Sequence, residues 1–318
     1  MTGPVWVGVD VGGTKILAGE VGADGAVRRT AVRPTPGRDV PVAWLEDVLT
    51  EAVLEVADGR RLAGVGLAAA GFVDADGERV AFAPHLPWRD DPVRARLADR
   101  WGARVALDND ANCAAFAEAE LGAARQDSSA VLVTVGTGLG GGIVLDGRVL
   151  RGAGGMAGEL GHMTVVPDGL PCECGGRGCW EQYCSGRALL RLARSGWGSG
   201  SLLEELCDGD PARLTGALVS RAAAQGDDHA QRALADVGRW LGLGLANVVA
   251  ALDPGCLVVG GGVSAAGEGL LDPARRALTA SLVGAAHRRV PPVRLAALGA
   301  GAGMVGAALL ARLDLPRR

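Results

Sequence analysis

The chain has 318 residues, 48% of them hydrophobic and 21% charged, so it is long enough for two domains and too apolar for a disordered protein. Its formal net charge is −4, which argues against nucleic acid or an anionic membrane as a partner. Lys15 is the sole lysine among 32 basic residues.

The N-terminal part of the chain alternates strands with helices. Short apolar runs bounded by glycine or aspartate predict strands, and longer runs with a spacing of three or four predict helices. The helix expected over residues 42–57 places Trp44, Val48 and Val56 on one face. Strands are expected at residues 5–10, 16–21, 27–32, 62–69 and 104–107, and further helices at residues 92–100 and from residue 110.

The pattern restarts after Ser128. A strand over residues 130–135 is followed by the sequence GTGLGGG and a strand over residues 143–145. Strand, glycine-rich turn and strand therefore occur twice, which indicates two related halves. A mostly helical stretch over residues 185–252 and a strand over residues 256–259 follow.

Two α/β domains that pack around a cleft are expected, because no linker of polar or proline-rich composition separates the halves. The small N-terminal domain covers residues 1–120 and is completed by a C-terminal helix over residues 302–318. The large domain covers residues 121–301 and contains the metal site described below.

The first glycine-rich turn, DVGGTK, lies between two strands. Gly12 and Gly13 allow backbone N–H groups to face a phosphate, Thr14 adds a hydroxyl, and Lys15 adds a charge. Asp10 could hold Mg²⁺ directly or through water. This is not a Walker A loop, which needs Gly-Lys-Ser/Thr leading into a helix. The alternative is an ordinary hairpin turn.

The second turn matches G-x-G-x-x-G through Gly136, Gly138 and Gly141. A dinucleotide site requires a helix next, whereas residues 142–147 have the pattern of a strand and a turn. We therefore reject a Rossmann site and expect a second phosphate turn, in which Thr137 donates its hydroxyl.

A third glycine run follows the strand over residues 256–259. Gly261 and Gly262 could admit the base or ribose of a nucleotide against the backbone. The alternative is a packing role, since the chain contains 51 glycines.

The sequence LDNDAN over residues 107–112 lies where a strand gives way to a helix. Asp108 or Asn109 could cap that helix. Three consecutive polar side chains exceed what a cap needs, so Asn109 and Asp110 could also grip adjacent hydroxyls of a polyol. Asp110 could then take a proton from one hydroxyl, and such general-base help is worth about 10²–10⁴-fold in rate.

A metal site is predicted within the sequence GELGHMTVVPDGLPCECGGRGCWE, residues 158–181. His162, Cys172, Cys174 and Cys179 have the residue types and close spacing of a tetrahedral zinc site. The alternative is a set of buried or disulfide-paired cysteines beside an unrelated histidine.

Two carboxylates flank this metal motif. Glu159 precedes His162 by three residues, and Glu181 follows Cys179 by two. A metal that fixes the loop would position these side chains as polar ligands.

A cytoplasmic location is expected. Seven cysteines are an odd number, and reduced thiols in a cytosol suit a metal motif better than disulfides do. The N-terminal sequence MTGPVWVGVD lacks the pattern of a signal peptide. The apolar stretch over residues 240–267 is broken by Asp253, Pro254 and Gly255 into pieces too short to span a bilayer, so no membrane partner is expected.

These motifs together resemble the ROK family of sugar kinases, repressors and uncharacterised open reading frames, within the actin/hexokinase-like ATPase superfamily. The resemblance spans nearly the whole chain and implies two actin-like (ribonuclease H-like) α/β domains. Within the family the chain most resembles the bacterial ATP-dependent glucokinases, partly through APHLPWRD over residues 83–90. It rests on the motifs DVGGTK, DNDAN, TVGTGLGGG, GELGH and CECGGRGCWE.

The resemblance also implies roles for individual residues. Asp110 would be the base for the 6-hydroxyl of a sugar, and His162 would use one ring nitrogen for zinc and the other for the sugar. Many family members carry Pro-Gly where this chain has Ala70-Gly71; the glycine that approaches the sugar is retained. The residues expected to bind the sugar are Gly71, Asn109, Asp110, Glu159, His162 and Glu181.

The expected reaction is transfer of the γ-phosphoryl group of Mg-ATP to the 6-hydroxyl of glucose, with zinc as a structural metal. One alternative is a kinase for mannose, N-acetylmannosamine or fructose, or one that also accepts polyphosphate. Another is a non-catalytic sugar sensor or regulator, although family regulators carry a DNA-binding helix-turn-helix before the first strand, which here begins at Val5. The family commonly forms dimers or tetramers, so a homo-oligomer is expected.

Overall fold

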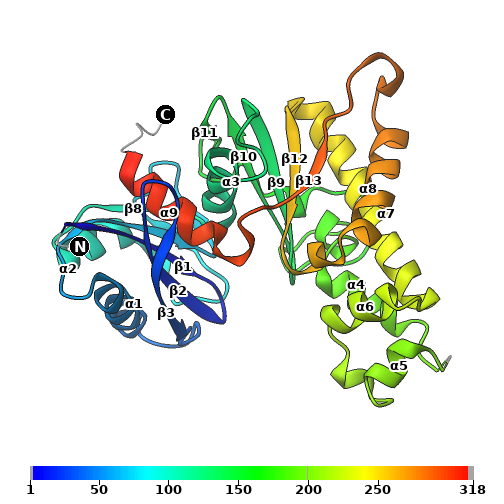
Figure 1. Ribbon diagram of the computed structural model, residues 1–318, viewed down its shortest axis with the longest axis horizontal. Coiled ribbons are helices and arrows are strands. Elements are labelled where there is room, and N and C mark those ends of the chain that lie inside the picture. The colour runs from blue at the N-terminus through cyan, green and yellow to red at the C-terminus, as the bar shows by residue number, and fades with distance from the viewer. Residues whose placement is uncertain (1–2, 199, 314–318) are drawn as a thin grey trace. The chain divides into compact units, whose positions relative to one another are not determined.

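The computed structural model describes residues 3–198 and 200–313, and Figure 1 shows their helices and strands. The chain divides into two compact units, and each is described by itself. The first consists of Met1–Ser129, Gly142–Gly158 and Ala297–Arg318, and the second of Ala130–Gly141 and Glu159–Ala296.

The domain boundaries expected from the sequence remain a prediction. Residues 142–158, expected in the large domain, belong to the first unit, where Arg151 forms an ion pair with Asp108. The end of the expected C-terminal helix, residues 314–318, lies outside the described residues.

The first unit contains a five-stranded sheet in the order β3-β2-β1-β4-β8. β1, β2 and β3 are antiparallel neighbours, whereas β4 runs parallel to both β1 and β8. Parallel strands end at the same edge, and the register places Asp10 beside Ala68 and Ala68 beside Asp108. The strands are β1 Val5–Val11, β2 Lys15–Val21, β3 Val27–Pro34, β4 Leu62–Ala69 and β8 Val105–Asn109.

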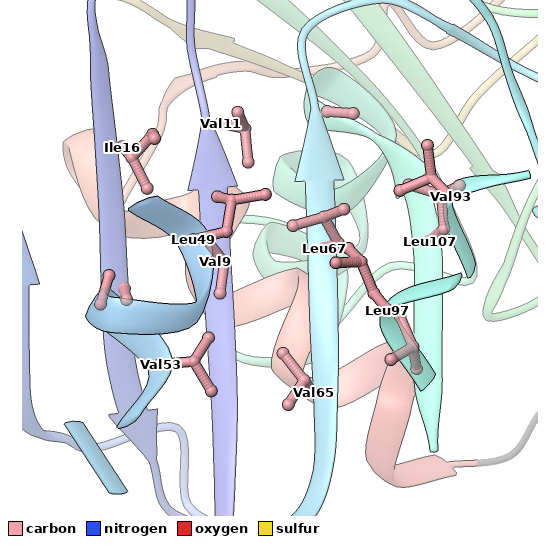
Figure 2. Close-up of a cluster of buried hydrophobic side chains, with 14 of the residues drawn as sticks. Val9, Val11, Ile16, Leu49, Val53, Val65, Leu67, Val93, Leu97 and Leu107 are labelled. Carbon is pink, nitrogen blue, oxygen red and sulfur yellow. The ribbon is translucent and has the colours of Figure 1, made fainter. Parts of the chain in front are cut away.

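One face of this sheet carries the larger part of the apolar core. Alternate residues of a strand point to opposite faces, so Val7, Val9 and Val11 lie on one side and Gly8 on the other. Figure 2 shows valines and leucines of the sheet against Leu49 and Val53, together with Leu97. Those partners come from helices α1 (Val42–Ala57) and α2 (Val93–Trp101).

The helical face predicted for α1 was partly wrong. Val56 is buried, but Trp44 is 54% exposed. The buried stripe instead passes through Leu45 and Leu49, which follow Trp44 and Val48 by one residue each. This face of the helix packs on β1, β2 and β3.

The opposite face of the sheet is covered by α9 (Ala302–Leu313). Here backbone packs directly on backbone: a Cβ atom at Gly66 would lie 1.8 Å from the carbonyl oxygen of Ala307. α9 also packs against α3 (Asp110–Glu120), which carries the second half of the LDNDAN motif in its first turn.

The first unit also holds a three-stranded sheet that the sequence did not predict. Its strands, β5 (Phe72–Val73), β6 (Val80–Phe82) and β7 (Arg89–Asp91), are too short to show a period of two. Beside α3 lies β11 (Arg148–Val149), which pairs antiparallel with the end of β10.

The second sheet has the order β11-β10-β9-β12-β13, and β12 is parallel to both β9 and β13. Its remaining strands are β9 Ser129–Val135, β10 Leu139–Leu145, β12 Cys256–Gly260 and β13 Val293–Leu295. The predicted strands are all present, whereas β13 was missed because its three residues give too little pattern.

Helices α4 to α7 of the second unit lie within the expected helical stretch over residues 185–252, and a further helix, α8, comes after it. The longest, α7, packs along α8, which the sequence did not predict (Figure 1). Within the described residues, no helix has both the length and the apolar character needed to cross a membrane. The helices are α4 Gly186–Arg194, α5 Leu202–Leu206, α6 Gly216–Ala224, α7 Asp228–Leu252 and α8 Glu268–Ser281.

Candidate active site and metal centre

Asp110 occupies the first position of α3, at the carboxyl edge of the first sheet. Asn109 is the N-cap of this helix, and its Oδ1 accepts hydrogen bonds from the backbone N–H groups of Ala111 (2.9 Å) and Asn112 (3.1 Å). The positive end of the helix dipole favours a carboxylate at this position. Asp110 is therefore a partly buried acid whose backbone is fixed by a capped helix.

Asp10, near the end of β1, is close enough for its charge to interact with that of Asp110. Burial, followed by the charge of Asp110, raises the pKa of Asp10 from 3.8 to about 7, while Lys15 opposes this rise. Burial also raises the pKa of Asp110, against hydrogen bonds from its own backbone N–H, that of Ala111 and the Asn109 side chain. Raised carboxyl pKa values are typical of groups that exchange protons at a functional site.

Asn109 combines its capping role with a contact to Gly71. Its Nδ2 donates to the carbonyl oxygen of Gly71 at 3.1 Å. The capping alternative from the sequence is thus correct for Asn109. The Asn109 side chain also hydrogen-bonds the Asp110 carboxylate, so its amide links Gly71 to the acid.

Asp108 is a structural partner and not a cap. Its carboxylate, 2% exposed, accepts from Arg151 Nε at 2.8 Å, from Asn112 Nδ2 at 3.1 Å and from the backbone N–H of Asn109 at 2.9 Å. The sequence did not identify Arg151, because it lies 43 residues from Asp108 and no local pattern joins the two.

The DVGGTK turn is a hairpin between β1 and β2. The N–H of Gly12 donates to the carbonyl of Lys15 at 3.0 Å, and the Thr35 hydroxyl donates to the carbonyl of Gly12 at 2.7 Å. Thr14 and Lys15 are exposed and Gly13 is partly buried. Hydrogen bonds therefore hold the backbone of the turn, and the side chain of His85 lies against Gly13.

The GTGLGGG turn joins β9 to β10, so a strand follows it and the rejection of a Rossmann site is confirmed. The N–H of Gly186, at the start of α4, donates to the carbonyl of Gly136 at 2.7 Å. A Cβ atom at Gly138 would lie 2.7 Å from Glu181 Oε2. Thr137 is exposed at the top of this turn.

The third glycine run begins where β12 ends. Gly261 has φ +84°, and a Cβ atom there would lie 2.5 Å from the carbonyl oxygen of Val135. The packing alternative is therefore correct for Gly261. No atom lies within 4 Å of a Cβ position at Gly262, which is exposed and leaves room for a ligand.

Four side chains of the second unit converge as a possible metal site. One ligand atom from each of His162, Cys172, Cys174 and Cys179 lies within 4.8 Å of all the others. The His162 Nδ1–Cys172 Sγ distance is 3.7 Å and the Cys174 Sγ–Cys179 Sγ distance is 3.6 Å. A tetrahedral metal with bonds of about 2.3 Å to sulfur and about 2.0 Å to nitrogen needs about 3.8 Å between two sulfurs and about 3.6 Å between nitrogen and sulfur. The two distances are close to these values.

The disulfide alternative is wrong. All seven cysteines lie among the described residues, and none of them forms a disulfide bond. A sulfur–sulfur distance of 3.6 Å also far exceeds the length of a disulfide bond, about 2.05 Å.

Both carboxylates that flank the metal motif lie beside it. His162 directs Nε2 toward Glu159 Oε2 at 3.9 Å, on the side of the ring away from the cysteines. Glu181 is buried, and its Oε1 lies 3.3 Å from Cys172 Sγ. The expected sugar ligands thus form two groups, Gly71, Asn109 and Asp110 in the first unit and Glu159, His162 and Glu181 in the second.

The sequence and fold match known proteins over nearly their full length. The ROK family model matches residues 6–313. A glucokinase of Streptomyces coelicolor is 42% identical over 310 residues, which cover 96% of this chain and 97% of the relative.

Two solved structures share the fold. One is a ROK family glucokinase from Streptomyces griseus in complex with glucose and AMPPNP, with a TM-score of 0.88 and 42% identity over 97% of this chain and 99% of that one. The other is a ROK hexokinase from Thermus thermophilus, with a TM-score of 0.78 and 38% identity over 98% of each chain. The resemblance seen in the motifs is confirmed, and the chain belongs to the ROK family.

Proposed function

We propose that this protein is a glucokinase that transfers the γ-phosphoryl group of Mg-ATP to the 6-hydroxyl of glucose. The observation that carries the proposal is Asp110, a carboxylate with a raised pKa at the capped start of α3, in a chain 42% identical to a glucokinase over nearly its whole length. Phosphoryl transfer of this kind depends mainly on positioning and charge stabilisation.

Asp110 acts as the general base in this proposal. It accepts the proton of the 6-hydroxyl as the oxygen attacks the γ-phosphorus and the bond to the β-phosphate oxygen breaks, which releases ADP. A base works best when its pKa lies near the working pH, so burial that raises the pKa of Asp110 suits the role.

The remaining sugar hydroxyls are assigned to Gly71, Asn109, Glu159, His162 and Glu181. Asn109 would contact the sugar beside Asp110, and His162 would present Nε2, since Nδ1 faces the cysteines. Carboxylates such as Glu159 accept hydrogen bonds from hydroxyls. A wrong epimer would leave such groups unpaired, and this can discriminate between substrates by roughly 10⁴–10⁵-fold.

The glycine-rich turns would bind the nucleotide. Asp10 would orient Mg²⁺, which neutralises phosphate charge when bound. Gly262 would face the base or ribose, and Gly261 would shape that loop through its positive φ. Phosphate oxygens are assigned to Gly12, Gly13, Thr14, Lys15, Thr137 and Gly138.

The metal is proposed to be Zn²⁺ with a structural role. Three thiolates and one imidazole form a closed tetrahedral set, which is typical of structural zinc. Its function would be to hold His162, Glu159 and Glu181 in place. Because such a site requires reduced thiols, we place the protein in the cytoplasm. A homodimer or homotetramer is proposed as its assembly.

The test is ADP release by the purified protein with Mg-ATP and glucose, mannose, N-acetylmannosamine or fructose. A signal that depends strongly on glucose and weakly on the other sugars is expected. A larger kcat/KM with another hexose would reassign the substrate. No signal with any hexose would contradict a hexokinase and return the protein to the class of sugar sensors.

A further inference from the structure

The side chain of Asp108 joins three segments of the first unit around the start of α3. It accepts two hydrogen bonds from the Arg151 guanidinium, through Nε at 2.8 Å and through Nη2. Its other oxygen accepts from the backbone N–H of Asn109 at 2.9 Å and from Asn112 Nδ2 at 3.1 Å. The carboxylate is thus engaged on both oxygens.

These hydrogen bonds involve residues on both sides of Asp110, the proposed base, in the chain. Asp108 is the second-to-last residue of β8, Asn109 ends the strand and caps α3, and Asp110 is the first helical residue. The backbone N–H that Asp108 holds therefore belongs to the residue before Asp110. Asp108 therefore holds the chain at the backbone N–H of Asn109, before the base, and at the Asn112 side chain, after it.

Arg151 supplies the positive charge that pairs with this buried carboxylate. The side chains of Asp108 and Arg151 are 3% and 14% exposed. A buried carboxylate whose cation is removed either takes up a proton or draws in water, and both change its hydrogen bonds. Loss of the Arg151 cation would therefore weaken the hydrogen bonds from Asn109 and Asn112 to Asp108.

We propose that Arg151, acting through Asp108, is a positioning residue that holds Asp110 in the orientation needed for proton abstraction. Arg151 is not assigned a contact with substrate. The inference rests on the proposed function for its kinetic effect, but the ordering of the α3 start that it describes is a property of the free protein.

A similar buried ion pair elsewhere in the first unit provides a control for the Arg151 substitution. Arg60 donates to both oxygens of Glu20, at 3.0 Å and 2.6 Å, and the two side chains are 18% and 9% exposed. Glu20 pairs with Val7 across the sheet, whereas Asp10 pairs with Leu17, so this ion pair is at the other end of β2. It offers the same chemistry without a link to the helix that carries the base.

The experiment compares Arg151→Met, Arg151→Lys and the control Arg60→Met. Both methionine variants are expected to melt at lower temperature. Only Arg151→Met should lose kcat with its hexose substrate, by roughly 10- to 100-fold, with KM for ATP unchanged, because a misplaced base affects the chemical step. Arg151→Lys keeps the charge and loses the two-pronged contact, so its kcat should lie in between.

Amide hydrogen exchange of residues 107–113 provides a second measurement that needs no substrate. Faster exchange in that segment is expected in Arg151→Met and not in Arg60→Met. Unchanged exchange and wild-type kcat in Arg151→Met would overturn the inference, as would equal effects in the two methionine variants. An inactive wild-type protein would contradict the proposed function alone, since the exchange comparison would still decide the positioning role.

Discussion

At the scale of single residues, the two carboxylates of the first unit differ in how they are held. Asp110 starts a helix whose first turn is capped by Asn109, whereas Asp10 is the second-to-last residue of strand β1. Both have raised pKa values, and burial is the largest cause in each case. Their proposed roles also differ, because Asp110 would exchange a proton and Asp10 would orient Mg²⁺.

Asp110→Asn is expected to lower kcat by about 10²–10⁴-fold, because the amide has the shape of the acid but accepts no proton at working pH. The fold should persist, since the backbone N–H groups of the first turn are capped by Asn109. Steady-state kinetics with the best hexose and circular dichroism check both parts. Unchanged turnover would remove Asp110 as the base.

Asp10→Asn is expected to raise the melting temperature of the ligand-free protein at alkaline pH. The pKa of Asp10 is raised from 3.8 to about 7, so the fold favours its neutral form. The stability it contributes is therefore fully present below 3.8 and is lost as pH rises through about 7. Asparagine is neutral at every pH, so the melting temperature of the variant should rise relative to that of the wild type as the pH increases.

Calorimetry without nucleotide or Mg²⁺, at about pH 5 and about pH 8, measures this gain. Each kcal/mol corresponds to roughly 2–4 °C in a protein of this size class. A difference between variant and wild type that does not grow with pH would argue against a raised pKa.

At the scale of elements, the segment that carries the possible metal site is held by contacts with α7. Trp180 follows the last cysteine ligand, is fully buried, and donates its indole N–H to the carbonyl of Trp240 at 2.7 Å. Tyr183 lies against the Trp240 ring, with the ring centres 4.7 Å apart. Glu181 lies between Trp180 and Tyr183 in the chain, so α7 helps to fix its position.

Gly244→Ala should disturb this anchor. A Cβ atom at Gly244 of α7 would lie 2.0 Å from the Trp180 ring, so the ring must move, at a cost of about 1–3 kcal/mol. The matched control is Gly269→Ala in α8, where the nearest atom is 3.9 Å away and alanine should stabilise the helix by up to about 1 kcal/mol. Urea unfolding should move in opposite directions for the two variants; a shift of the same sign in both would contradict the contact.

Cys174→Ser is expected to lower the melting temperature, the bound zinc and the affinity for the sugar together. A hydroxyl is a poor zinc ligand, and the loop that holds His162 and Glu181 would lose one of its four fixed points. The control is Cys207→Ser, a buried cysteine outside the cluster, which should keep its zinc and its KM. Metal analysis, melting curves and KM for glucose report the outcome, and wild-type values in Cys174→Ser would refute the positioning role of the metal.

At the scale of the whole molecule, each unit is assembled from segments that are distant in the chain. The first unit combines the N-terminal strands with residues 142–158 and the C-terminal helix α9. α9 is buried over most of its length, and it covers the face of the sheet where Gly8 and Gly66 remove side chains from its path. The sheet that presents Asp10 is thus completed by residues some 300 positions later.

Glucose is expected to stabilise the protein by mass action. At a concentration of 100 times Kd, a ligand that binds only the folded state adds about 2.7 kcal/mol. Asp110→Asn should show nearly the same increase in melting temperature as the wild type, because the substitution removes a proton acceptor and leaves the other proposed ligands. Loss of the increase in that variant would mean that Asp110 acts mainly in binding.

The sequence by itself determined the features that short stretches encode. The glycine turns between strands, the LDNDAN motif at a strand-to-helix junction and the spacing of His162 and the three cysteines were all visible, because strand periodicity, turn chemistry and metal chelation act over a few residues. These motifs identified the family, and most strands and helices of ordinary length were placed within a few residues.

Only the tertiary structure decided which distant residues meet. The pairing of Asp108 with Arg151 across 43 residues and the packing of Trp180 on α7 leave no local pattern. The same holds for the pKa of Asp10, which depends on burial and on a charge from another strand's end. Such contacts arise because chain folding brings together groups whose separation in sequence carries no information about their distance in space.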